Sequence, residues 1–78
     1  MALQVQATTL PDVGFAKLII RAYENPDGPW LKQLGVRIDH YRLKGKSYDQ
    51  ISRRAQEVTD IEAGDWEALM QLLDEQKH

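Results

Sequence analysis

Few side chains in this sequence have the chemistry that nucleophilic catalysis needs. The only serines are Ser47 and Ser52, and the only histidines are His40 and His78. A serine nucleophile needs a positioned base to accept its proton. Ser47 is better explained as a helix cap and His78 is the last residue, so a catalytic pair would depend on His40 alone. We therefore predict no catalytic residue and no enzymatic activity.

Metal and cofactor sites are not predicted either. A metal site needs several His, Cys or carboxylate ligands that converge. The chain has no cysteine, and His40, which follows Asp39, has no second histidine one helical turn away. The five glycines are isolated rather than grouped in a phosphate-binding loop. The carboxylates of the C-terminal third are typical of a solvated helix face, so no cofactor is implied.

Charge is distributed unevenly along the chain. Residues 32–54 hold seven basic and two acidic side chains, a net charge of +5, whereas residues 55–78 carry a net charge of −6. Lysines and arginines that displace counterions supply most non-specific affinity for nucleic acid, and Tyr41 and Tyr48 lie among them. Residues 37–54 thus indicate a nucleic-acid-binding regulator as an alternative function.

The segment LKGKSYDQISRRA, residues 43–55, resembles the first helix of a helix-turn-helix motif, with a capped start before an inward isoleucine and an alanine. The resemblance implies that the next helix would read bases. That place is taken by TDIEAGDWEALMQLL, residues 59–73, whose carboxylates would face phosphates. A reading helix needs Arg, Lys, Asn or Gln near its start, and none occurs between Thr59 and Met70. The basic residues are therefore better suited to form a solvated face that pairs with the acidic C-terminal helix of the same molecule, or to contact phosphate or an acidic protein.

The elements that would position these side chains are helices. Turn signals at residues 24–29 and 44–47 and around Gly64 separate four pieces whose apolar residues recur at helical spacing. We expect the first helix over about residues 11–24 and the last over about residues 65–76. These intervals predict an all-α fold, a small bundle of three to four short helices that forms one domain over residues 1–78. The expected core is Phe15, Leu18, Ile19, Leu34, Ile38, Ile51, Ala55, Leu69 and Leu73.

The helix boundaries follow from capping chemistry. Asp27 is a candidate N-cap for the second helix, and Asp65 for the fourth. Ser47 and Gln50 fit a capping box at the start of the third helix, and Gly45 can close the helix before it.

An α+β fold is the alternative architecture. In it, LQVQA at residues 3–7 forms a short strand, where residues 1–8 would otherwise be a flexible tail. GVRIDHYRL, residues 35–43, can also be read as a strand.

The predicted function is binding of another protein. A chain of 78 residues has a thin core, and without cysteine it depends on packing or on a partner and fits the reducing cytoplasm. Its short apolar runs predict neither a signal peptide nor contact with a membrane. We expect an inhibitor, adaptor or regulatory subunit, with a homodimer as its simplest form. The candidate partner-binding residues are Trp30, Trp66, Met70, Arg42, Lys44, Lys46, Arg53 and Arg54.

Overall fold

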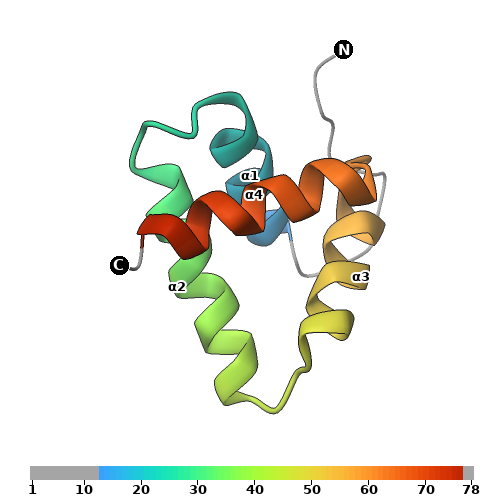
Figure 1. Ribbon diagram of the computed structural model, residues 1–78. Coiled ribbons are helices and arrows are strands. Elements are labelled where there is room, and N and C mark those ends of the chain that lie inside the picture. Colours follow the sequence, from blue (N-terminus) through green and yellow to red (C-terminus); the bar gives the residue numbers. More distant parts are fainter. Residues whose placement is uncertain (1–12, 77–78) are drawn as a thin grey trace.

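Four α-helices make up the computed structural model of the chain, which describes residues 13–76 (Figure 1). They are α1 (Val13–Glu24), α2 (Trp30–Leu43), α3 (Tyr48–Val58) and α4 (Ala63–Gln76). The prediction of a small all-α bundle is confirmed. The strand reading of residues 35–43 is wrong, because these residues lie in α2. Residues 3–7, the other candidate strand, lie outside the described residues.

The turn between α2 and α3 is fixed by local chemistry that the sequence predicts. The Gln50 amide N–H donates to Ser47 Oγ at 3.2 Å, and the Ser47 N–H donates to Gln50 Oε1 at 2.8 Å, which completes the capping box. Gly45 has φ 91°, in the left-handed region that favours glycine. Its N–H donates to the carbonyl of Arg42, so the last turn of α2 is closed by a backbone hydrogen bond.

Two of the predicted helix starts are wrong. Pro29, not Asp27, precedes the first residue of α2, and it supplies no side-chain cap. Asp65 is not an N-cap, because α4 begins at Ala63. The Trp66 N–H already donates to the carbonyl of Glu62 at 2.9 Å, which places Asp65 inside the first turn. A carboxylate there still interacts favourably with the positive end of the helix dipole.

Aromatic side chains from three helices meet at the centre of the bundle. The ring of Phe15 on α1 makes edge-to-face contacts with Tyr41 on α2, at 5.2 Å between centroids, and with Trp66 on α4, at 6.4 Å. Such pairs add to the free energy gained from burying the rings. The buried apolar residues around them are Ala16, Ile19, Ala22, Leu31, Leu34, Ile38, Ile51, Ala55, Val58, Ile61, Leu69 and Leu73.

One residue of the predicted core lies elsewhere. Leu18 is only half-buried and packs at the edge of the core, whereas every other predicted core residue is buried. Because α1 is apolar around most of its circumference, spacing alone does not choose the buried side. The other helices cover the side that carries Phe15, Ala16 and Ile19, which leaves Leu18 beside the covered strip.

Helix α4 approaches α2 closely at a glycine. A Cβ atom on Gly35 would lie 2.8 Å from Cδ1 of Leu73, shorter than a van der Waals contact. The glycine therefore lets the two helices pack at this distance, and Figure 1 shows α4 passing across α2. This packing offsets the weak helix propensity of glycine within α2.

The connection between α3 and α4 is stabilised by a buried threonine. Thr59 Oγ1 donates to the carbonyl of Ala55 at 2.7 Å and accepts the N–H of Ile61 at 3.2 Å. Ile61 is itself buried and anchors the connection to the core. The few residues between the two helices thus have a defined path.

Candidate functional site

Four of the predicted partner-binding cations line one pocket. It has a volume of about 440 Å³ and lies between the end of α2 and the length of α3. We call it the α2–α3 pocket. Its lining consists of Tyr41, Lys44, Lys46, Gln50, Ile51, Arg53, Arg54 and Glu57.

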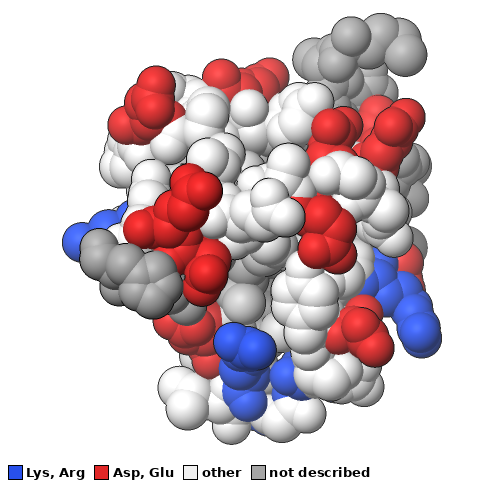
Figure 2. Space-filling model, viewed as in Figure 1, with Lys and Arg blue, Asp and Glu red and all other residues white. Residues whose placement is uncertain are grey.

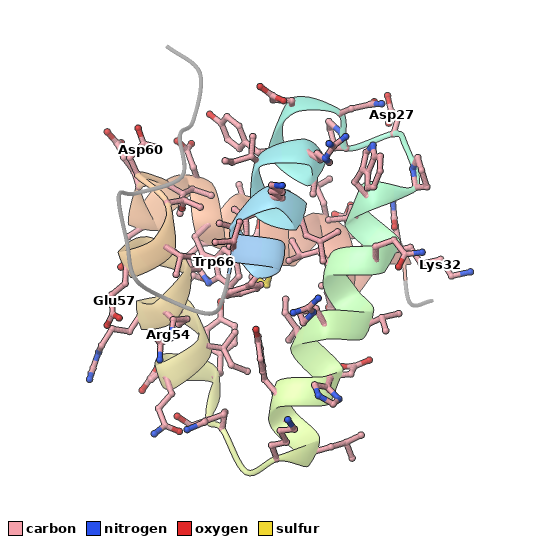
Figure 3. All side chains as sticks on the ribbon, turned by 180° about the vertical axis from the view of Figure 1, so that it is seen from behind. Asp27, Lys32, Arg54, Glu57, Asp60 and Trp66 are labelled. Carbon is pink, nitrogen blue, oxygen red and sulfur yellow. The ribbon has the colours of Figure 1, made fainter. Side chains whose placement is uncertain are left out.

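Helical spacing places the α3 residues in this lining. Gln50, Arg53, Arg54 and Glu57 are separated by three or four positions, so they share one face of the helix. Figure 3 shows Arg54 and Glu57 close together on α3, away from Lys32 near the start of α2. The capped turn after α2 brings Lys46 to the same pocket from the other side.

The floor of the pocket belongs to the hydrophobic core. Ile51 is only 2% exposed, and Tyr41 is half-buried with its ring against Phe15. Because these side chains are held by core packing, the floor keeps its shape when no ligand is bound. The pocket therefore combines an apolar and aromatic base with a charged entrance.

The rim carries more positive than negative charge. Lys44, Lys46, Arg53 and Arg54 face one carboxylate, Glu57, whose Oε2 lies 3.5 Å from Arg54 Nη1. Both members of this ion pair are about half exposed, so water screens it and it contributes little to stability. An acidic ligand would thus meet an excess of positive charge.

An exposed leucine stands beside these cations. Leu43, the last residue of α2, is 88% exposed and lies between the exposed side chains of Arg42 and Lys44. Leu43 was not among the predicted partner-binding residues, although it lies off the buried α2 strip of Leu31, Leu34 and Ile38. We define the basic corner as Arg42, Leu43, Lys44, Lys46, Arg53 and Arg54.

Trp66 does not belong to an exposed surface, and this corrects the prediction. It is 1% exposed, and its indole N–H donates to Ser52 Oγ at 2.8 Å. Figure 3 shows it pointing in among the helices. Burial of the ring is favourable because it removes a large apolar area from water and the indole N–H keeps a hydrogen-bond acceptor.

The other two predicted apolar contacts lie apart from the basic corner. Trp30 is half-buried at the opposite end of α2, where the Arg21 guanidinium lies 4.7 Å from the centre of the ring. Met70 is half-buried on α4 and packs against the core. The predicted partner-binding residues therefore do not form one surface. Only the basic ones lie in one region, around the end of α2 and along α3.

Acidic side chains occupy a different part of the surface. Figure 2 shows them over the face that α4 crosses, whereas basic side chains lie toward the edges of that view and the end where α2 and α3 meet. Two α4 carboxylates accept tyrosine hydroxyls: Glu67 from Tyr48 at 3.2 Å and Asp65 from Tyr23 at 3.4 Å. The pKa of Tyr48 is raised above its ordinary value, mainly by burial and also by Glu67. The nearby carboxylate of Asp65 raises the pKa of Tyr23.

Within residues 13–76, no three His, Cys, Asp or Glu side chains are grouped so that they could hold a metal ion. The helices of that same part of the chain lack the length and apolar character that crossing a membrane requires. No family model matches the chain, and comparisons with curated proteins and with solved structures returned no significant match.

Proposed function

We propose that this protein is a non-enzymatic binding protein, of the inhibitor, adaptor or regulatory-subunit kind, that recognises an acidic surface of another protein through the basic corner. The observation that carries the proposal is Leu43, 88% exposed among cationic side chains. Protein interfaces combine apolar anchors with a polar or charged rim. Leu43 supplies the anchor, and Arg42, Lys44 and Lys46 supply the rim.

A protein partner explains the corner better than nucleic acid does. An exposed leucine gains nothing from a phosphate backbone, whose affinity comes from cations that displace counterions. Carboxylates are also interspersed with the cations, since Asp49 lies in the first turn of α3 and Glu57 lines the pocket. The helix that follows α3 carries Asp65 and Glu67, which would repel a duplex seated across both helices.

The charge pattern also favours fast association. The +5 block and the −6 segment lie in separate parts of the sequence, and charges of this kind orient a partner before contact. A second copy of the chain is one partner with a suitable acidic surface, so homodimerisation is part of the proposal. We place the protein in a reducing compartment such as the cytoplasm, because it has no cysteine.

The test compares two charge reversals of equal size. Arg42→Glu with Lys46→Glu changes the basic corner, and Lys17→Glu with Lys32→Glu changes exposed sites outside it. A partner captured from the source cells is titrated against the protein by surface plasmon resonance at two salt concentrations. We expect the corner variant to slow association about tenfold or more at low salt, and the control variant to bind nearly as the parent does.

The same experiment has two outcomes that would contradict the proposal. Equal weakening by both variants would mean that net charge, not the corner, decides binding. Tighter binding to duplex or single-stranded oligonucleotides than to any protein, lost in the corner variant, would favour the nucleic-acid alternative with residues 37–54. Sedimentation equilibrium of the protein alone shows whether the partner is a second copy.

A further inference from the structure

We infer that the α2–α3 pocket is the specificity site of the basic corner and accepts a large apolar side chain from an acidic segment of the partner. This inference rests on the proposed function and names the partner's chemistry. The pocket volume of about 440 Å³ lies at the small end of the range of ligand sites. It is therefore suited to one or two side chains rather than to a folded surface.

The floor determines what enters the pocket. The half-buried ring of Tyr41 offers an aromatic contact beside the nearly enclosed side chain of Ile51, and the ring is held edge-to-face by Phe15 at 5.2 Å. A leucine or phenylalanine side chain would gain free energy by leaving water here. A phosphate group could pair with the cations of the rim, but it would gain nothing from the apolar side chain of Ile51.

The rim determines what surrounds that side chain. Lys44 and Lys46 line the pocket from the turn between α2 and α3, and Arg53 and Arg54 line it from α3. A segment bound there meets cations from the turn and from the helix, so carboxylates near the apolar residue find partners. This charge complementarity selects an acidic segment over a neutral one.

The two ends of the pocket differ in charge. Its α3 wall runs from Gln50 to Glu57, which is about 10 Å at the rise of an α-helix. Glu57 and its pairing with Arg54 make that end less positive than the end near Lys46. The densest carboxylates of the segment should therefore lie toward the turn between α2 and α3, over a length of about three extended residues.

Three synthetic peptides test the inference, titrated into the isotope-labelled protein and followed by amide shifts in NMR spectra. The first carries one leucine between glutamates, the second has alanine in place of leucine, and the third has glutamines in place of the glutamates. We expect the first to shift the amides of Tyr41, Ile51 and their neighbours, and each of the other two to bind at least tenfold more weakly. Arg53→Glu should weaken the first peptide at least tenfold, whereas Lys32→Glu should leave it unchanged.

Arg53 and Lys32 are both exposed, so neither variant is expected to disturb folding, and circular dichroism checks this. Equal binding of the leucine and alanine peptides would overturn the inference, because the floor would then play no part. Shifts at the pocket caused by inorganic phosphate or by oligonucleotides but by none of the peptides would also overturn it. If the peptides fail while reversal at Arg42 and Lys46 still abolishes partner binding, the proposed function stands and only the pocket inference fails.

Discussion

Replacing Trp66 should destabilise the fold rather than weaken a surface contact. A fully buried tryptophan replaced by alanine costs about 3 to 5 kcal/mol. A domain of this length has a total stability of about 4 to 12 kcal/mol, taken at roughly 0.05 to 0.15 kcal/mol per residue. Since Trp66 is 1% exposed and touches Phe15, we expect Trp66→Ala to remove about a quarter or more of the free energy of unfolding.

The contribution of the indole hydrogen bond to stability can be measured separately from that of packing. Ser52→Ala removes the acceptor of the Trp66 N–H, which costs about 1 kcal/mol if water reaches the half-buried site and up to about 3 kcal/mol if it does not. In a Trp66→Phe background the same Ser52→Ala change should cost less, because the indole donor is already gone and only the hydrogen bond of Ser52 with Tyr48 is lost. The difference between the two backgrounds is the coupling energy of the pair.

Urea unfolding followed by far-ultraviolet circular dichroism measures all of these variants, since removing a tryptophan also alters the fluorescence. Trp30→Ala is the matched control, because Trp30 is only half-buried. We expect it to cost less than half as much as Trp66→Ala. Equal costs for the two tryptophans would refute the enclosure of Trp66, and equal costs of Ser52→Ala in both backgrounds would refute the hydrogen bond.

Four further substitutions test the local structure. Ser47→Ala should cost about 1 kcal/mol in urea unfolding, because the cap of α3 is lost; no change would mean that the capping box contributes nothing in solution. Gly45→Ala should destabilise by about 1 kcal/mol because of its positive φ, whereas Gly64→Ala, with open space around it in the first turn of α4, should stabilise by up to about 1 kcal/mol. Burial and the Glu67 carboxylate raise the folded-state pKa of Tyr48 above the ordinary value of 10.0, so its contribution to stability is complete below pH 10 and is lost as the pH rises through the folded pKa. Alkaline unfolding titrations should therefore show a smaller loss of stability in Tyr48→Phe than in the parent, and an identical loss would contradict this assignment.

Local chemistry made part of this fold predictable. The Ser47–Gln50 capping box and the glycine turn at Gly45 need only neighbouring residues, and both are present as expected. Leu18 was harder to place, because α1 offers apolar residues on most sides and the other helices choose which side is covered. The caps expected at Asp27 and Asp65 fail because tertiary packing sets where α2 and α4 begin.

The candidate site was also predictable only in part. Its cations are evident in the sequence, but their convergence with Tyr41 and Ile51 on one pocket depends on the angle between α2 and α3. Composition favoured Trp66 as an interface residue, yet Ser52, fourteen positions earlier, supplies the acceptor that allows its burial. The long-range contacts that decide these points leave no pattern in the neighbouring residues.

Thr59 holds the connection between α3 and α4 in one conformation. Rearranging this connection would break the bond from the Ile61 amide to Thr59 Oγ1 and would leave that buried N–H unsatisfied. The Ile61 amide should therefore exchange with solvent slowly, through opening of the bundle, although it lies outside every helix. Because neither Thr59 nor Ile61 lines the proposed binding surface, this protection of the Ile61 amide should already be present in the free protein.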